Sequence, residues 1–185
     1  AKPVAYDPEG AKKLLAEAGY PNGFELTLGT PNDRYINDEK VAQAVAQMFT
    51  RVGVKTNVDA MTASTFFTRR NKHEFSAYLA GWGADSGEMS NSLNALVVTP
   101  NKETGGGHTN RGRYSNKEVD ALVQEAQRTI DDAKREELLQ KASKIAMEDH
   151  ALLPLHFEVT PWAFKKTLTY TPRIDQYTLA TEVKL

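Results

Sequence analysis

Hydrophobic residues along the N-terminal half of the chain switch between helical spacing and strict alternation with polar residues. Asp7-Pro8 predicts a helix start, because Asp caps the first turn and Pro fits its first position, and Gly19 ends that helix. Alternation of apolar with polar residues predicts strands. The predicted elements are helices at residues 7–19, 38–52 and 64–71 and strands at 24–28, 54–60 and 75–81.

The C-terminal half is more helical. Ser115 and Glu118 have the spacing of a capping box and open one helix, and Asp131 or Asp132 starts another. Closing strands are expected at residues 152–159 and 177–183, and residues 88–114 form a long irregular excursion. This alternation of helices and strands predicts an α/β fold, with helices flanking a mostly parallel or mixed sheet.

Residues 75–88, with the sequence FSAYLAGWGADSGE, are the most informative segment. Its apolar first part predicts a central strand that is buried on both faces. Gly81 and Gly83 leave room for close approach by a ligand or a second chain, and Trp82 offers a flat apolar face. Asp85 adds a negative charge past the strand, where open α/β sheets usually bind ligands. The alternative is a strand, a glycine turn and a Trp buried in the core.

Composition narrows the class of protein. Of the 185 residues, 40% are hydrophobic and 25% charged, as is ordinary for a globular domain. The net charge of −1 gives no indication of electrostatic binding to nucleic acid or to an anionic membrane. The absence of Cys excludes disulfides, thiolate metal sites and Cys nucleophiles. Because the chain starts at Ala1 without Met, we expect a processed chain or a piece of a longer protein.

No set of residues has the spacing of a catalytic or metal site. The four His residues are not spaced to place two ligands on one helix face, so we expect no metal and no cofactor. No Ser lies in a nucleophile-elbow context, and nothing pairs a His with an Asp. Gly105-Gly106-Gly107 lacks the Lys-Ser/Thr of a phosphate loop, which favours a flexible hairpin tip. The sequence therefore favours a binding module over an enzyme.

Three segments together carry a resemblance to a known family. They are YDPEGAKKLLAEAGYPNGFELTL, FSAYLAGWGADSGE and YSNKEVDALVQEAQRTIDDAKREELLQKASKIAMEDHALLPLHF. In this order the chain resembles the C-terminal lobe of extracytoplasmic solute-binding proteins, in the oligopeptide, dipeptide and nickel-binding group that serves bacterial ABC importers. The resemblance implies a periplasmic-binding-protein-like (type II) clamshell, in which residues 1–185 form one ligand-binding lobe of a longer, two-lobed protein.

The resemblance also implies roles for single residues. In peptide-binding relatives the Asp three residues after the Trp accepts the α-ammonium group of the peptide, a role that falls here to Asp85, with Trp82 as part of the pocket wall. Arg70, twelve residues before Trp82, matches an Arg that contacts longer peptides or their carboxylates; otherwise it is a solvated Arg at a helix end. The expected ligand-binding residues are Arg70, Gly81, Trp82, Gly83 and Asp85.

The chain departs from many relatives after Asp85, where they continue with Tyr and an acidic-Pro pair. Ser86-Gly87-Glu88 is instead similar to the subgroup that binds glutathione. Arg111 and Arg113, in the loop before Tyr114, are either contacts for a ligand carboxylate or solvated.

The resemblance implies non-catalytic capture of a small peptide or peptide-like solute for an ABC importer. The implied partners are that solute, the missing N-terminal lobe of the same protein and the membrane permease of the importer, with no nucleic acid. The implied location is the periplasm, or the extracytoplasmic face with a lipid anchor in a Gram-positive source. The alternative is a free-standing hydrolase or transferase domain with its site in the 88–114 loop.

Overall fold

The structure is a computed structural model that describes residues 5–84, 87–173 and 175–184. The chain forms two compact units, residues 1–82 and 83–185. The expectation that residues 1–185 are one lobe of a longer protein stays a prediction. Within the described ranges, no helix has both the length and the hydropathy needed to cross a membrane.

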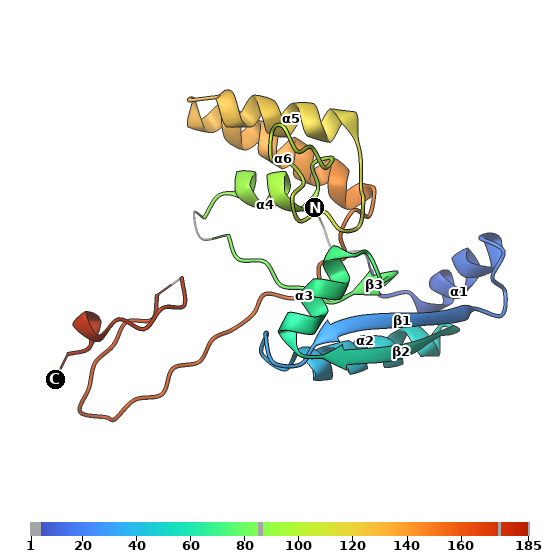
Figure 1. Ribbon diagram of the computed structural model, residues 1–185, viewed down its shortest axis with the longest axis horizontal. Helices are drawn as coiled ribbons and strands as arrows, with labels where there is room; N and C mark the ends of the chain where they lie inside the picture. Colours follow the sequence, from blue (N-terminus) through green and yellow to red (C-terminus); the bar gives the residue numbers. More distant parts are fainter. Residues whose placement is uncertain (1–4, 85–86, 174, 185) are drawn as a thin grey trace. The chain divides into compact units, whose positions relative to one another are not determined.

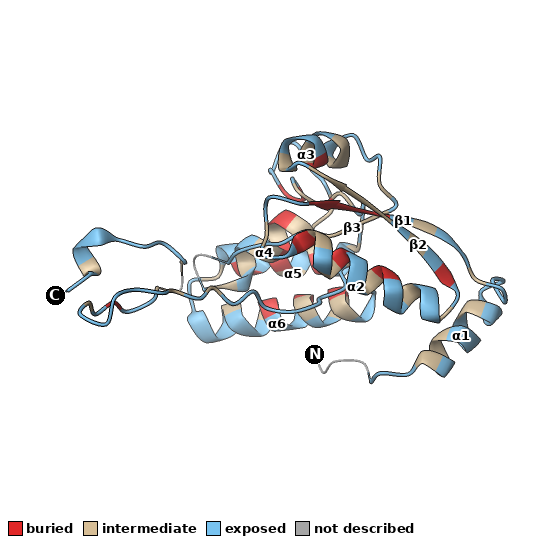
Figure 2. Cartoon of the chain, turned by 90° about the horizontal axis from the view of Figure 1, so that it is seen from below, coloured by how far each residue is buried: buried red, intermediate tan, exposed pale blue. Residues whose placement is uncertain are grey.

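The first unit is built around a three-stranded sheet with strand order β2-β1-β3 (Figure 1). Its elements are α1 (Pro8–Glu17), β1 (Phe24–Pro31), α2 (Asp38–Arg51), β2 (Val54–Met61), α3 (Ala63–Asn71) and β3 (Ala77–Tyr78). The sequence left open whether the sheet is mostly parallel or mixed. Both strand pairs in the structure are parallel. Because crossovers between parallel strands are right-handed, α2 and α3 cover opposite faces of the sheet (Figures 1 and 2).

The helices and strands predicted for this unit are present, but the strand before Trp82 is not central. The helix start at Asp7 is confirmed, since its Oδ1 accepts a 2.8 Å hydrogen bond from the N–H of Gly10. β3 spans only two residues, both half-buried, and lies at the edge of the sheet. β1 is the central strand, and residues 28–31 are its buried part. An apolar run shows that a segment packs against something, but not how many strands flank it.

The core of the first unit lies where α2 and α3 meet the sheet. α2 buries Ala42 and Ala46 on the side that packs on β1 and β2. α3 buries Phe66, whose ring centre lies 5.7 Å from that of Phe75. α1 buries none of its residues, so its apolar side chains contribute little to this core.

The second unit is helical. It contains α4 (Met89–Leu96), α5 (Lys117–Arg128), α6 (Asp132–Glu148) and a 3₁₀ helix, η1 (Ala180–Glu182). Apolar residues on and just after the three α-helices form its buried core; they are Leu93, Val97, Val119, Val123, Ala126, Leu139, Ala142 and Ala146. Of the two predicted starts of α6, Asp131 and Asp132, the structure confirms Asp131 as the cap, since its Oδ1 accepts a 2.8 Å bond from the N–H of Lys134.

Two local predictions for this unit are wrong. Asn116, and not Ser115, caps α5: its Oδ1 accepts a 2.9 Å hydrogen bond from the N–H of Glu118. The Ser115 hydroxyl lies instead 2.9 Å from the hydroxyl of Thr99, a partner that is distant in sequence. The 88–114 stretch is also not wholly irregular, because it contains α4.

The closing strands predicted at residues 152–159 and 177–183 are absent from the described part of the chain. Residues 152–159 form no element and no backbone–backbone hydrogen bond within the described ranges, and η1 lies within the second segment. Alternate apolar side chains of the first segment are exposed, among them Leu153 (66%), Phe157 (97%) and Val159 (79%) (Figure 2). An alternating sequence becomes a strand only where a neighbouring strand satisfies its backbone groups.

Candidate functional site

The three parallel strands of the first unit end at the same edge of the sheet, where the loops that follow them meet. The N–H of Asn32, after β1, donates to the carbonyl of Met61 at the end of β2 over 2.9 Å. Asp33 Oδ1 accepts a 2.7 Å bond from the N–H of Ala63, where α3 begins. Open α/β sheets bind ligands at this edge. Residues 32–37 and 79–82 are therefore the candidate site of the first unit.

Tyr35 joins the loop after β1 to the segment after β3. Its hydroxyl donates to the carbonyl oxygen of Gly81 over 3.4 Å. Its ring packs on the same glycine, because a β-carbon at position 81 would lie 2.8 Å from Tyr35 Cε1. The close approach predicted at Gly81 is thus made by a side chain of the same chain. Tyr35 was not predicted from the sequence as a residue of the site. The only feature of the sequence that could have indicated it is its position as an aromatic residue in a polar loop after a strand.

A buried carboxylate holds this loop. Asp38, the first residue of α2, is 3% exposed, and its Oδ2 accepts 3.0 Å bonds from the N–H groups of Arg34 and Tyr35. These bonds and the positive end of α2 compensate for burying the charge. The guanidinium carbon of Arg34 lies 5.2 Å from the centre of the Tyr35 ring, which places a cation beside the aromatic face at the carboxyl edge.

The predicted ligand-binding residues fall in both units. Gly81 and Trp82 end the first unit, and Trp82 is 42% exposed, so the alternative of a Trp buried in the core does not hold. Gly83 is the first residue of the second unit and is exposed. Asp85 and Ser86 lie outside the described residues, so the role of Asp85 stays a prediction.

Arg70 lies away from the carboxyl edge. It is in the last turn of α3, which begins at that edge, so about 10 Å of helix separate the two. Its guanidinium carbon is 4.9 Å from the centre of the Phe67 ring. The preceding Arg69 donates to Asp59 over 2.8 Å and to Glu74 over 2.9 Å, and these hydrogen bonds raise its pKa. The ligand role of Arg70 stays a prediction.

The loop at residues 98–114 is folded around a buried asparagine. Asn110 is 3% exposed, and its Nδ2 donates to the carbonyl oxygens of Val98 over 3.0 Å and Tyr114 over 2.8 Å. Arg111 donates to the carbonyl of His108 over 2.6 Å, so it takes part in this loop, whereas Arg113 is exposed. Across the described ranges, no three His, Cys, Asp or Glu side chains are grouped as metal ligands.

Tyr114 ties this loop to the end of α6. Its hydroxyl donates to Asp149 Oδ2 over 2.6 Å, and Asn116 Nδ2 donates to the same oxygen over 2.8 Å. Partial burial, followed by the bond to Asp149, raises the pKa of Tyr114 to about 12. The bonds from Tyr114 and then Asn116 lower the pKa of Asp149. Both shifts move the pKa values of Tyr114 and Asp149 further from neutral pH. The pair is therefore a structural contact rather than a general acid and base that exchange a proton near pH 7.

Comparison with known proteins identifies the family. Residues 1–104 match the model of "Bacterial extracellular solute-binding proteins, family 5 Middle". The chain belongs to this family. That assignment confirms the resemblance in its sequence and gives no support to the hydrolase or transferase alternative.

The relatives are much longer proteins. The chain is 34% identical over 173 residues to glutathione-binding protein GsiB of Escherichia coli (strain K12), covering 91% of this chain and 33% of that protein. It is 33% identical over 162 residues to heme-binding protein A of Haemophilus influenzae, covering 83% and 28%. Periplasmic binding protein DppA from Helicobacter pylori, in complex with the peptide STSA, matches with a TM-score of 0.72 and 29% identity, covering 81% and 28%.

The chain thus spans about a third of the length of the curated relatives it matches. The structural similarity confirms the predicted α/β fold of a type II periplasmic binding protein.

Proposed function

We propose that this chain belongs to the solute-binding component of a bacterial ABC importer and captures a small peptide or peptide-like solute. The family match of residues 1–104 is the observation that carries this proposal. A relative named for glutathione and a similar structure that holds a peptide support the peptide-like class. The Ser86-Gly87-Glu88 run after Asp85 favours the same class.

The chemistry of the candidate segment suits such a solute. The Asp85 carboxylate pairs with the ammonium group of the ligand, and burial of both charges on binding is offset only if they pair. The exposed face of Trp82 covers an apolar part of the ligand and excludes water from it. Gly83 leaves the backbone open to the ligand. None of these roles requires bond breaking, so the proposed function is binding without catalysis.

The rest of the binding surface, in this proposal, is supplied by the N-terminal lobe of the same protein, and the closed complex delivers its solute to the membrane permease. The chain covers only about a third of its relatives, which leaves length for a second lobe. The exposed apolar side chains at residues 152–159 would be buried if further parts of the longer protein packed on this segment. A protein of this family with this role acts outside the cytoplasm, in the periplasm or on a lipid anchor.

The test is to purify the full-length protein, denature it and measure the mass of the released ligand. We expect a peptide or peptide-like mass, and calorimetry with that compound should give a stoichiometry near one. Release of heme, a sugar or a metal chelate alone would contradict the proposed ligand class. Appearance of cleaved products on incubation with peptides would instead support the enzyme alternative.

A further inference from the structure

Asp38, the first residue of α2, directs one of its carboxylate oxygens to the loop that precedes the helix. Asp7 and Asp131, which cap α1 and α6, accept hydrogen bonds from N–H groups three residues ahead of them, within their own helices. The Oδ2 atom of Asp38 accepts instead from the N–H groups of Arg34 and Tyr35, four and three residues before it, both over 3.0 Å. This carboxylate therefore shapes the loop after β1 as well as the start of α2.

The carboxylate of Asp38 is buried and is satisfied by the backbone. Asp38 is 3% exposed, and its second oxygen, Oδ1, accepts a 2.9 Å bond from the N–H of Glu39. Within the described ranges, its side chain accepts from three backbone N–H groups and from no side chain. Because a buried carboxylate is costly without these bonds, it fixes the backbone groups that donate them.

Tyr35 is held by Asp38 at both of its backbone polar groups. Its N–H donates to Asp38 Oδ2 over 3.0 Å, and its carbonyl oxygen accepts a 3.3 Å bond from the N–H of Asp38. Between them, Asn37 has a φ of 57°, a left-handed conformation that Asn adopts more readily than most residues. With both polar groups fixed, the direction in which the Tyr35 side chain leaves the backbone is set by Asp38.

The Tyr35 side chain in turn fixes the peptide group that joins Gly81 to Trp82. Its hydroxyl donates to the Gly81 carbonyl oxygen, and its ring fills the space that a β-carbon at position 81 would take. This carbonyl belongs to the planar peptide unit that includes the nitrogen and α-carbon of Trp82. Two residues before Gly81, the N–H of Leu79 donates to the carbonyl of Gly29 over 2.9 Å, so the segment is also held to β1.

We propose that Asp38 is a positioning residue for Trp82: by holding Tyr35, it fixes the backbone that carries the indole ring. The inference rests on the proposed function, in which the exposed face of Trp82 covers an apolar part of the solute. Every contact in this series lies within the first unit. The physical effect is preorganisation, because an indole on a fixed backbone has fewer conformations to lose when the solute binds.

The first test measures solute affinity of the full-length protein by calorimetry, using the ligand identified by mass. Asp38→Ala should weaken binding roughly 2- to 30-fold. The control Asp131→Ala, which removes an acidic helix cap in the second unit, should change it by less than about twofold. Asp38→Asn keeps one acceptor oxygen and should restore part of the affinity. In a Trp82→Ala background, Asp38→Ala should cause no further loss, because its effect passes through Trp82.

The second test needs no ligand and follows the indole itself. In full-length protein labelled with fluorotryptophan, the fluorine NMR signals of Trp82 and Trp162 are assigned by their loss in Trp82→Phe and Trp162→Phe. Asp38→Ala should shift or broaden the Trp82 signal of the folded protein and leave unchanged the signal of Trp162, which lies in the second unit. Tyr35→Ala should change the Trp82 signal in the same way, because it removes the contact to Gly81 and leaves the buried carboxylate in place.

Equal effects of Asp38→Ala and Asp131→Ala on affinity would overturn the inference, as would an unchanged Trp82 signal in Asp38→Ala. The same loss of affinity with and without Trp82 would also overturn it, because that result marks a general structural effect. If Asp38→Ala does not fold, Tyr35→Ala replaces it in both tests with the same expected results. A wild-type protein that binds no peptide-like solute defeats the proposed function. Binding that depends on Trp82 but not on Asp38 or Tyr35 defeats this inference alone.

Discussion

Tyr35 packs its ring against the backbone of Gly81 and donates a hydrogen bond from its hydroxyl to the Gly81 carbonyl oxygen. The two residues are 46 positions apart in sequence and meet because β1 and β3 are neighbours in a parallel sheet. The contact fixes the backbone directly before Trp82. The sequence predicts that Gly81 leaves room for a ligand. In the structure, the Tyr35 ring of the same chain fills the space that a side chain at position 81 would take.

Gly81→Ala should destabilise the first unit by about 1–3 kcal/mol, because the new β-carbon would lie 2.8 Å from Tyr35 Cε1 and force the ring to move. Urea unfolding followed by circular dichroism measures the change. In a Tyr35→Ala background the same substitution should cost much less. Gly112→Ala is the control, since nothing lies within 4 Å of a β-carbon there. A Gly81→Ala variant as stable as this control would contradict the packing argument.

Asp85→Asn should weaken solute binding to the full-length protein by roughly 30- to 5000-fold, since removal of one partner of a buried charge pair costs about 2–5 kcal/mol. Thermal stability without ligand should scarcely change. Calorimetry and thermal melting of the same preparation measure the two effects. Glu136→Gln, on an exposed position of α6, is the charge-matched control. Unchanged affinity with a large loss of stability would show that Asp85 is a structural cap.

The isolated 185-residue chain should bind its solute weakly or not at all. One lobe of a clamshell keeps only part of the contacts, while the ligand still loses its translational and rotational freedom. Calorimetry of this chain and of the full-length protein with the same ligand gives the comparison. Sub-micromolar binding to the isolated chain would show that a second lobe is unnecessary.

Residues 152–159 should form a strand only in the full-length protein. In this chain Leu153, Leu155, Phe157 and Val159 are all exposed, although their alternation is that of a strand. Hydrogen exchange followed by mass spectrometry should show rapid exchange of this segment in the isolated chain and strong protection in the longer protein. Equal, rapid exchange in both would mean that the segment stays unpaired.

Tyr114→Phe should lower the free energy of unfolding at neutral pH, because it removes the donor to Asp149. The folded-state pKa of Tyr114 is raised from 10.0 to about 12, so the stabilisation is complete below pH 10.0 and is lost as the pH rises toward about 12. The pKa of Asp149 is lowered from 3.8, so the stabilisation is also lost as the pH falls below that value. Urea unfolding across pH should show wild type and variant converging at both extremes. A difference that persists unchanged at both would contradict this assignment.

Local structure was predictable where neighbouring residues decide it. Asp7 and Asp131 cap helices because an acidic oxygen reaches N–H groups a few residues ahead, and both predictions are confirmed. The cap of α5 was misassigned to Ser115, because Asn116 is an equally good cap by sequence and Ser115 finds its partner in Thr99, which local reasoning does not see. The prediction of the two closing strands was wrong for a related reason, because a strand forms only where a neighbouring strand pairs with its backbone.

The candidate site divides in the same way. Trp82 was found from sequence because two glycines flank it, and its exposure fits a surface residue. Tyr35 was missed, because its importance lies in a contact to Gly81 that spans 46 residues. No spacing rule links residues so far apart.

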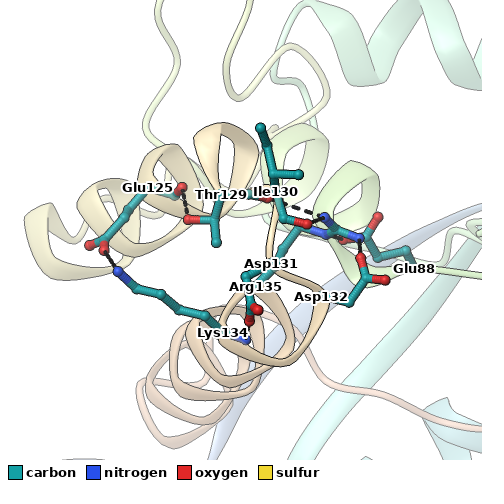
Figure 3. Close-up of polar contacts among 8 residues, drawn as sticks. All are labelled: Glu88, Glu125, Thr129, Ile130, Asp131, Asp132, Lys134 and Arg135. Carbon is teal, nitrogen blue, oxygen red and sulfur yellow. Dashed lines mark hydrogen bonds and ion pairs between the residues drawn. The ribbon is translucent and has the colours of Figure 1, made fainter.

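The sequence by itself determined the family, the α/β class and most helix and strand positions, because hydrophobic period, caps and ordered motifs are properties of neighbouring residues. The tertiary structure alone decided that β1 is the central strand, that Tyr35 covers Gly81 and that Arg135 in α6 donates a hydrogen bond to Glu88, just before α4 (Figure 3). These features depend on which distant segments come together, and that choice is made by packing of the whole chain rather than by any local pattern.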